Sequence, residues 1–381
     1  MKILLLANYE QDNQFSMLGF AGMMKAGLEQ TGHEVTMFQP RVNFGKGRNT
    51  HQGIGKWLGY YDKYIIGPRN LKRVIKNSSP DIVHICDHAN AVYLPHIKGP
   101  KTIVTCHDLF AIKTWLGKIA GQSKSAIGAL QQKWIFNHLI KSPSIACVSH
   151  ATRDDLNTLA PETKSRTNVI LSGLPYPYEP LPPEQADKII SGAELVTISG
   201  EPMPRKFILH VGNNSWYKNR IGVIEIAKKA FGSVSDIGLV LAGQPVNEEL
   251  RHAMVGLEDR ISILERPSNS VLQALYCKAT CFLFPSLAEG FGWPPLEAQA
   301  CGCPVVVSNI EPLRSNCKSA LFIDPLNTSD SAQHLVGLLN DSSRLRKLSL
   351  DGLKNAERFK PKAMIDAYIS LYEQAVRSHA A

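Results

Sequence analysis

CFLFPSLAEGFGWPPLEAQACGCPVVV, residues 281–307, contains two strands with a helix between them. Its first part, CFLFPS (281–286), is an apolar run that ends in a turn, and VVV (305–307) begins a second apolar run. Residues 296–301 predict a helix, which stops at the Gly-Cys-Pro sequence that follows. Strand, helix and strand in this order are the repeating unit of a parallel sheet, so the stretch predicts an α/β fold.

Two carboxylates bracket the connector of this unit. Glu289 lies in the loop beyond the strand's carboxyl end, and Glu297 lies in the following helix, which is where open α/β sheets bind ligands. Gly290 and Gly292 let the backbone approach a ligand, and helix-start amides suit an anion. A carboxylate accepts hydrogen bonds from two neighbouring hydroxyls, so the connector predicts a site for a ligand that carries both phosphate and sugar.

The rest of the chain alternates strands and helices in the same way. Strands are expected at 2–8, 34–39, 81–86, 102–107, 144–149, 167–173, 207–212, 237–243 and 261–264. Helices are expected at 16–30, from 149–152 onward, and at 219–231, 247–255, 271–279, 331–341, 342–357 and 363–378.

A proline-rich stretch, residues 174–206, interrupts this alternation and predicts a hinge between two doubly wound domains that face each other across a cleft. We expect a first Rossmann-like domain over 1–185, a linker over 186–206 and a second Rossmann-like domain over 207–362. The C-terminal helix, about 363–381, is expected to pack back on the first domain.

Composition and length agree with a soluble globular protein of about two domains. The chain has 381 residues, of which 44% are hydrophobic and 20% charged. MKILLLANYEQ at the start predicts a first strand and not a signal peptide, and no apolar run reaches the ~18–20 residues that span a bilayer. The eight cysteines have no metal-site spacing, so we expect buried thiols and no bound metal.

Positive charge is concentrated in the first half of the chain. Residues 1–190 hold 22 Lys and Arg against 14 Asp and Glu, whereas residues 191–381 hold 20 against 19. Segment 41–76 combines basic residues with aromatic ones and has a single acid, Asp62. Its members are Arg41, Lys46, Arg48, Lys56, Lys63, Arg69, Lys72, Arg73, Lys76, Trp57, Tyr60, Tyr61 and Tyr64. Such a segment fits a peripheral contact with the inner membrane face, an anionic acceptor or a merely solvated surface; no nucleic-acid module accompanies it.

Several motifs together resemble the retaining glycosyltransferases of family 4, also called glycosyl transferases group 1. They are HVGNNSWYKNR (210–220), VLAG (240–243), FPSLAEGFGWPPLEAQACGCPVVVS (284–308) and EPLR (311–314), with weaker matches at CHD (106–108) and VSHATRDDL (148–156). The resemblance implies the GT-B fold and transfer of a hexose from a UDP- or GDP-sugar with retained configuration and no catalytic metal. It implies a saccharide, glycolipid or lipid-linked acceptor, in bacterial polysaccharide or glycolipid synthesis.

The resemblance assigns donor contacts to the second domain. Glu289 would contact hydroxyls of the transferred sugar, and the amides around Gly290, Phe291 and Gly292 would approach the sugar or diphosphate. Glu297 would hold the ribose diol. Lys218 would pair with the diphosphate and neutralise it as it leaves.

Two loops depart from the family pattern. Relatives usually carry an arginine shortly before the lysine, where this chain has Asn213, Asn214 and a serine. Arg220, or donors such as the two asparagines, would then supply the second phosphate contact. Relatives also often have a glycine pair after the first strand; here Ser16 is expected to cap the following helix and present donors to the acceptor or phosphate.

On the first domain, His107 ends the strand 102–107, where the family's histidine reaches the transferred sugar; a buried core histidine is the alternative. Arg153 either points to an acceptor or phosphate or lies on a helix surface. With no nucleophile evident, the resemblance favours front-face attack, in which a diphosphate oxygen takes the acceptor's proton. Other expectations left open are a nucleotide-sugar epimerase, a phosphorylase and a sugar-binding protein without catalysis.

Overall fold

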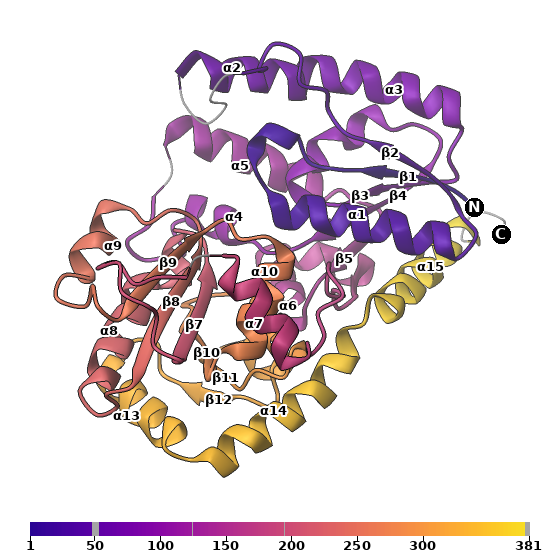
Figure 1. Cartoon of the computed structure of the whole chain (residues 1–381). Helices are drawn as coiled ribbons and strands as arrows, with labels where there is room; N and C mark the ends of the chain where they lie inside the picture. Colours follow the sequence, from indigo (N-terminus) through magenta and orange to yellow (C-terminus); the bar gives the residue numbers. More distant parts are fainter. Residues whose placement is uncertain (48–52, 124, 194, 378–381) are drawn as a thin grey trace. The chain divides into compact units, whose positions relative to one another are not determined.

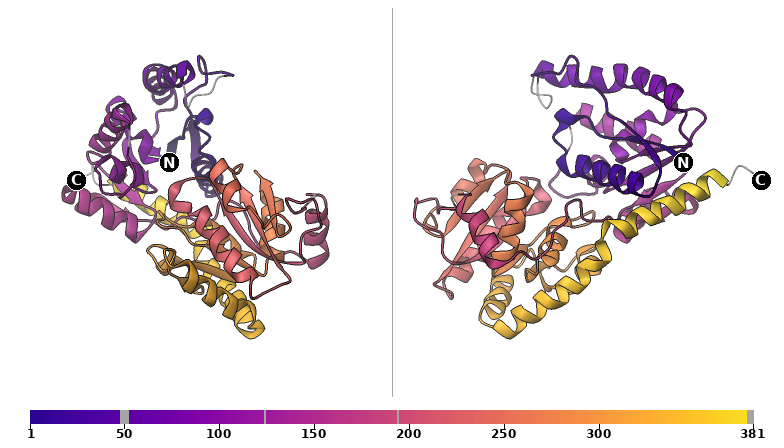
Figure 2. Two further views of the ribbon diagram at one scale, coloured as in Figure 1. Left: turned by 90° about the vertical axis from the view of Figure 1, so that its left-hand side faces the viewer. Right: turned by 45° about the vertical axis from the view of Figure 1, so that its right-hand side comes forward.

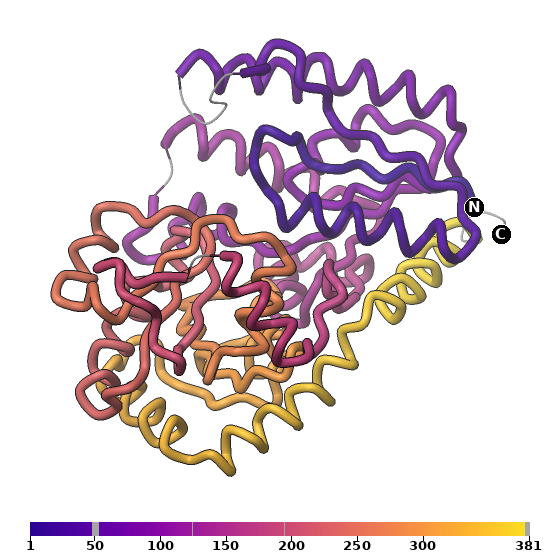
Figure 3. The backbone as a smooth tube through the Cα atoms, in the orientation of Figure 1, coloured from indigo at the N-terminus to yellow at the C-terminus, as the bar shows by residue number. Residues whose placement is uncertain are grey.

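The computed structural model describes residues 1–47, 53–123, 125–193 and 195–377 (Figures 1 and 3). The chain forms two compact units, each described below by itself. The first consists of Met1–Pro175 together with Pro361–Ala381, and the second of Tyr176–Lys360. Among the described residues, no helix is both long and apolar enough to cross a membrane.

The first unit contains a six-stranded sheet in the order β2-β1-β3-β4-β5-β6, and every neighbouring pair is parallel. Its strands are β1 (Lys2–Leu6), β2 (Glu34–Phe38), β3 (Ile82–Ile85), β4 (Lys101–Cys106), β5 (Ile145–Cys147) and β6 (Thr167–Val169). Its helices are α1 (Phe15–Gln30), α2 (Gly53–Tyr61), α3 (Gly67–Ser78), α4 (Phe110–Trp115), α5 (Ala126–Leu139), α6 (His150–Leu159) and α15 (Pro361–Arg377). The strand order reverses between β1 and β3, so the loops after these two strands diverge at one point of the carboxyl edge.

The second unit contains a parallel sheet in the order β12-β11-β10-β7-β8-β9. Its strands are β7 (Lys206–Gly212), β8 (Ile237–Gly243), β9 (Ile261–Glu265), β10 (Cys281–Phe284), β11 (Val305–Ser308) and β12 (Leu321–Ile323). Its helices are α7 (Pro183–Ser191), α8 (Arg220–Phe231), α9 (Glu248–Ala253), α10 (Asn269–Lys278), α11 (Trp293–Ala300), α12 (Leu313–Asn316), α13 (Thr328–Leu339) and α14 (Ser342–Ala356). This is the doubly wound dinucleotide-fold order, with its switch point between β7 and β10. The prediction of two doubly wound α/β sheets is therefore confirmed.

Each sheet is buried on both faces, which is why its strands are continuous apolar runs in the sequence. In the first unit, Leu4, Val83 and Val104 are fully buried in one core cluster. In the second, Ile208 and Leu239 are fully buried in another. Each unit thus has its own hydrophobic core.

Helix α15 packs against α1 and β4 of the first unit (Figure 2). Its Tyr372 hydroxyl lies 2.6 Å from Nδ1 of His84, and its Tyr368 hydroxyl lies 2.7 Å from Oγ1 of Thr105. Gly27 of α1 leaves room for the helix, because a Cβ there would lie 2.5 Å from Ile365. The last residues of the predicted helix, 378–381, lie outside the described part of the chain.

The stretch predicted as a linker, residues 186–206, does not stand apart from the two units. Helix α7 occupies part of it and packs against α10, with Ala186 fully buried. Farther along, Ser262 of β9 donates a 2.6 Å hydrogen bond to the carbonyl of Val196. The prolines fit because Pro183 stands at the first helical position, which needs no amide proton. The segment belongs to the second unit, which begins at Tyr176, earlier than the expected boundary at residue 185.

Candidate active site

The loops after β7 and β10 diverge at the switch point of the second sheet, and both predicted carboxylates and Lys218 lie there. The two loops are joined by a hydrogen bond of 2.7 Å from the amide of Leu287 to the carbonyl of Tyr217. This bond holds the residues after β10 beside the 3₁₀ turn Trp216–Lys218. Residues 71 positions apart in the sequence are thereby brought into contact.

Lys218 and Glu289 form an ion pair, with Nζ 2.7 Å from Oε1. Their side chains are only 12% and 6% exposed. The ammonium also lies 4.8 Å from the ring centre of Phe284 and 5.2 Å from that of Tyr217, within cation–π range. Lys218 ends the 3₁₀ turn that precedes helix α8, and Asn219 caps that helix. The pair places one positive and one negative group side by side at the edge of the sheet.

The glycine loop between the carboxylates is shaped by its packing. Gly292 has φ 92°, and a Cβ there would lie 2.6 Å from Leu313. The Phe291 ring points into the core and packs edge-on against Phe359 at 5.7 Å, so only its backbone faces a ligand. Two prolines follow Trp293 in the first turn of α11 and lack amide protons. Donors for an anion here therefore come from residues 290–293 rather than from the first turn as a whole.

Glu297 lies in α11 and is only 8% exposed. Its Oε2 accepts a hydrogen bond of 2.9 Å from the Tyr276 hydroxyl, a contact that the sequence analysis missed. Burial raises the pKa of Glu297 to about 7, although the bond from Tyr276 and the charge of Lys218 act in the opposite direction. The carboxylate is thus held where ionisation is costly, as is common at functional sites.

This burial predicts a pH-dependent stability. Because the folded-state pKa lies above the ordinary value of 4.5, the folded chain holds a proton that the unfolded chain has released between pH 4.5 and about 7. The free energy of unfolding therefore falls as pH rises through this window. Relative to Glu297→Gln, the wild type is expected to lose on the order of 2 kcal/mol between pH 5 and pH 8. Urea unfolding of both proteins at the two pH values measures this, and a pH-independent difference would contradict the burial argument.

The asparagines after β7 shape the loop. Asn213 accepts a 3.0 Å bond from the amide of Ser215, and the side chain of Asn214 donates to the carbonyl of Pro245 at 2.8 Å. Arg220 is 4% exposed and donates through Nη1 to Asn214 and to the carbonyl of Gln244. Its Nε and Nη2 are buried and have no hydrogen-bond partner among the described residues. The guanidinium is largely buried between this loop and the residues that follow β8.

The backbones of β7 and β8 approach each other closely at their carboxyl ends. Gly243 has φ 127°, and a Cβ there would lie 2.2 Å from the carbonyl oxygen of Gly212. Only glycine fits this position, which explains the glycine at the end of VLAG. The approach leaves a bare backbone surface beside the Lys218 loop.

The first unit gathers polar side chains at the carboxyl ends of β1 and β3. Asn8 donates to Asp87 at 2.6 Å and accepts from Asn90 at 3.0 Å. His88 lies 3.2 Å from Asp87, and although burial works against protonation, Asp87 and Asp108 raise the pKa of His88. The sequence analysis missed this group; its signal was an acid and a histidine directly after the buried strand 81–86.

His107 lies at the end of β4 and is 6% exposed. Its Nε2–H donates 2.8 Å to the carbonyl of Cys86, and its ring packs edge-on against Phe20. Burial is the main influence and lowers the pKa of His107, so the ring is neutral at pH 7. The geometry of the ring is that of a bonded core histidine, and its carbonyl accepts a 3.3 Å bond from Thr152.

Two expectations in the first unit need correction or restriction. Ser16 does not cap α1: the helix begins at Phe15, and Gln14 stands at the cap position without a side-chain bond. Ser16 is exposed within the first turn. Arg153, in α6, pairs with the neighbouring Asp154 at 2.7 Å, which is the helix-surface alternative.

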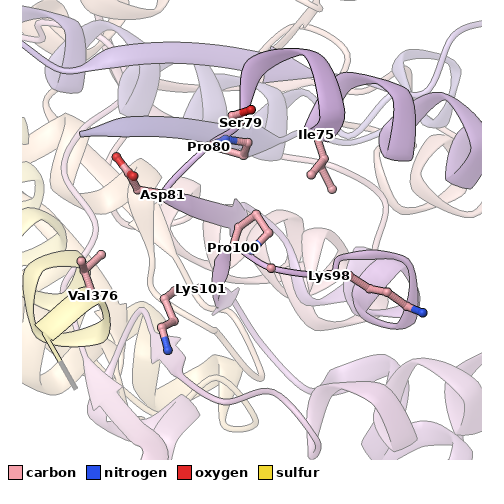
Figure 4. A pocket seen from close by; sticks show the side chains of 9 residues that line it. Ile75, Ser79, Pro80, Asp81, Lys98, Pro100, Lys101 and Val376 are labelled. Carbon is pink, nitrogen blue, oxygen red and sulfur yellow. The ribbon is translucent and has the colours of Figure 1, made fainter. Parts of the chain in front are cut away.

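An open hollow of about 490 Å³ in the first unit lies at the other edge of its sheet from Asp87, His88 and His107 (Figure 4). Asp81 and Lys101 line it at the amino ends of β3 and β4, and Val376 of α15 lines it from the other side. The carboxyl edge, where the candidate residues gather, is the opposite edge of the sheet. The hollow is thus separate from the candidate site.

Two family models match the chain. The model described as Glycosyltransferase Family 4 matches residues 21–175, and that described as Glycosyl transferases group 1 matches residues 193–355. A curated relative, a D-inositol 3-phosphate glycosyltransferase of Salinispora tropica, is 30% identical over 38% of this chain and 32% of its own length. The match thus spans about a third of that relative.

Solved structures share the fold over the full chain. Sucrose-phosphate synthase from Thermosynechococcus elongatus has a TM-score of 0.73 at 17% identity, covering 99% of this chain and 100% of its own. HepE from Anabaena, in complex with UDP and glucose, has a TM-score of 0.72 at 15% identity, covering 98% and 99%. The two family models together account for most of the residues in both units, and the chain belongs to glycosyltransferase family 4, the glycosyl transferases of group 1.

Proposed function

We propose that this protein transfers a hexose from a nucleoside-diphosphate sugar to a hydroxyl of a saccharide or lipid-linked acceptor, with retained anomeric configuration. The observation that carries the proposal is the buried Lys218–Glu289 ion pair beside Glu297 at the switch point of the second sheet. A nucleotide sugar offers an anion for the lysine and two sets of vicinal hydroxyls for the carboxylates. Solved structures of the same fold hold UDP with glucose, and UDP-2-fluoro glucose, as bound compounds.

In this proposal Lys218 and Glu289 act on the two sides of the bond that breaks. Lys218 binds the diphosphate and stabilises its charge as it leaves. Glu289, 2.7 Å from the lysine, accepts hydrogen bonds from the hydroxyls of the transferred sugar. The amides of residues 290–293 add donors, since the two prolines of α11 supply none.

Glu297 is assigned to the ribose of the nucleotide. As a carboxylate it accepts hydrogen bonds from the 2′- and 3′-hydroxyls, and Tyr276 fixes its orientation from the other side. The base is assigned to the backbone at Gly212 and Gly243, the last residues of β7 and β8. Arg220 contributes positive potential from behind the loop and, through Asn214, holds its shape.

The chemical step we propose is front-face substitution. The acceptor oxygen bonds to the anomeric carbon as the bond from that carbon to the diphosphate oxygen breaks, and the acceptor proton passes to a diphosphate oxygen. The acceptor is assigned to the first unit, at the carboxyl ends of β1, β3 and β4, where Asp87, His88 and His107 lie. The reaction is placed in the cytoplasm, where nucleotide sugars are made.

A thermal-shift screen over UDP-, GDP- and ADP-sugars tests the donor class. The matching nucleotide is expected to raise the melting temperature, because a ligand at about 100 times its Kd stabilises the folded state by about 2.7 kcal/mol. Lys218→Ala and Glu297→Ala should abolish the shift, whereas Lys347→Ala, on the exposed side of α14, should retain it. No shift with any nucleotide sugar would sink the proposal.

The reaction class needs a second measurement. With the matching donor labelled in its sugar, label should reach product only when an acceptor fraction is present. Epimerisation would proceed without acceptor, and phosphorolysis would require inorganic phosphate. Either pattern would replace transfer as the function.

A further inference from the structure

We propose that helices α2 and α5 of the first unit form one surface that docks on an anionic lipid bilayer. The first half of this surface is an apolar stripe along α2 and the π-helical turn Asp62–Ile66 that follows it. Ile54, Trp57, Tyr61 and Ile65 are spaced three or four residues apart and therefore share a face. Ile54 is 70% and Trp57 57% exposed. Apolar side chains so exposed and so aligned need a partner to bury them.

The second half of the surface lies on α5, far away in the sequence. Ile127, Leu130 and Trp134 repeat the same spacing, and all three are exposed, Leu130 by 67%. The sequence analysis did not predict a helix over residues 126–139 and so found no stripe there. Its stripe becomes apparent only from the exposure of its side chains.

An unbroken row of aromatic rings joins the two helices. The ring centres of Trp57 and Tyr60 are 5.9 Å apart, those of Tyr60 and Tyr64 5.5 Å, and those of Tyr64 and Trp134 5.0 Å. Gln131 of α5 also bonds to the hydroxyl of Tyr64 at 2.8 Å. The apolar stripes of the two helices are therefore joined by this row of rings, and α2 and α5 lie next to each other (Figure 1).

The charges on these helices are complementary to an anionic surface. Between residues 41 and 80 the one acid is Asp62, and from 109 to 153 there is no acid at all. Asp62 is fully buried and accepts bonds from the amides of Asn43, Phe44 and Gly45. Lys56 and Lys133 carry positive charge on α2 and α5. Each basic residue near an anionic bilayer adds to the attraction.

The structure also reduces the number of basic residues in segment 41–76 to which a lipid contact can be assigned. Lys63 is not a surface cation: it pairs with Asp12 at 2.8 Å and lies 5.2–5.6 Å from the ring centres of Tyr9, Tyr60 and Tyr64. Arg48 lies outside the described residues. The lipid contact is therefore assigned to the exposed stripes and to the remaining basic residues.

We infer that the occupant is a lipid surface, because a bilayer offers both acyl chains for the apolar stripes and anionic headgroups for the basic residues. Apolar side chains flanked by basic ones enter the boundary between headgroups and acyl chains. The inference concerns the first unit alone and does not depend on the donor site in the second, so it stands or falls separately from sugar transfer.

Flotation of the full chain with vesicles tests the proposal. Phosphatidylcholine vesicles with roughly one third phosphatidylglycerol should carry the protein to the top of the gradient, and pure phosphatidylcholine vesicles should not. High salt should reduce the binding. In the double variant Ile54→Gln/Leu130→Gln, affinity should fall by at least about tenfold, because two apolar side chains no longer enter the bilayer.

The matched control is Leu326→Gln in the second unit, which changes another exposed leucine, 81% exposed, and should bind as the wild type does. Both variants should keep the melting temperature and the nucleotide-induced thermal shift of the wild type, which shows that folding and the donor site are intact. Unchanged vesicle binding in the double variant would overturn the proposal. So would a wild-type dimer, seen by sedimentation velocity, that the double variant abolishes without loss of lipid binding.

Discussion

Replacing Lys218 by alanine is expected to lower kcat for sugar transfer by about 100- to 1000-fold, the range found when a single transition-state donor is removed. The ammonium is 12% exposed and lies against the rings of Phe284 and Tyr217, so its charge is weakly screened by water. Arg220 is less suited to replace it, because its guanidinium is largely buried and its Nη1 already donates to Asn214 and to the carbonyl of Gln244. Initial-rate kinetics with saturating donor measure the effect.

Glu289, the partner of Lys218 in the ion pair, provides a second test of this prediction. Glu289→Ala removes the 2.7 Å partner of Lys218 and the proposed contact to the sugar hydroxyls, so it should also slow transfer. Because the two side chains form one unit, the double variant should lose less than the product of the two single losses. Multiplicative losses would show that the two side chains act independently, and a Lys218→Ala enzyme with unchanged kcat would show that the pair is structural. Lys206→Ala, which breaks an exposed ion pair with Asp236, should leave kcat unchanged.

The position of this site could be predicted because its signal is local. Glu289 and Glu297 follow one buried strand, Lys218 follows another, and parallel strands bring their carboxyl ends to one edge. The family motifs placed these residues in the right loops. Neither the succession of strands nor the family motifs indicated the switch point between β7 and β10. It arises from the pairing order of strands far apart in the sequence.

The residues that were missed or misjudged depend on tertiary packing. Tyr276 reaches Glu297 from α10, a helix whose sequence shows only apolar periodicity. The burial of Arg220 was not foreseen, because it depends on contacts with Asn214 and Gln244, while its contact with phosphate stays a prediction. The cap predicted at Ser16 lies two positions earlier, at Gln14, since the helix begins at Phe15 and local propensity does not fix the first residue.

Replacing Glu297 is expected to weaken nucleotide binding while it makes the folded chain more stable. Glu297→Ala should lower the affinity for the matching nucleoside diphosphate by about 100-fold, because hydrogen bonds to a charged group contribute about 1.5–3 kcal/mol. Glu297→Gln, which keeps the shape, should lose about tenfold and gain stability above pH 7, where the wild type must ionise a buried carboxyl group. Isothermal titration calorimetry and urea unfolding at pH 8 measure the two effects.

A deoxyribose analogue separates the ribose contact from a general effect on the site. The wild type should bind the 2′-deoxynucleoside diphosphate about tenfold more weakly than the ribose form, since one charge-assisted hydrogen bond is lost. Glu297→Ala should bind both forms equally, because the group that distinguishes them is gone. Glu289→Ala, in which the ribose contact is intact, should retain the discrimination while transfer is slow. If Glu297→Ala still preferred the ribose form, the carboxylate would have another role, and its buried bond to Tyr276 would then be a feature of the core.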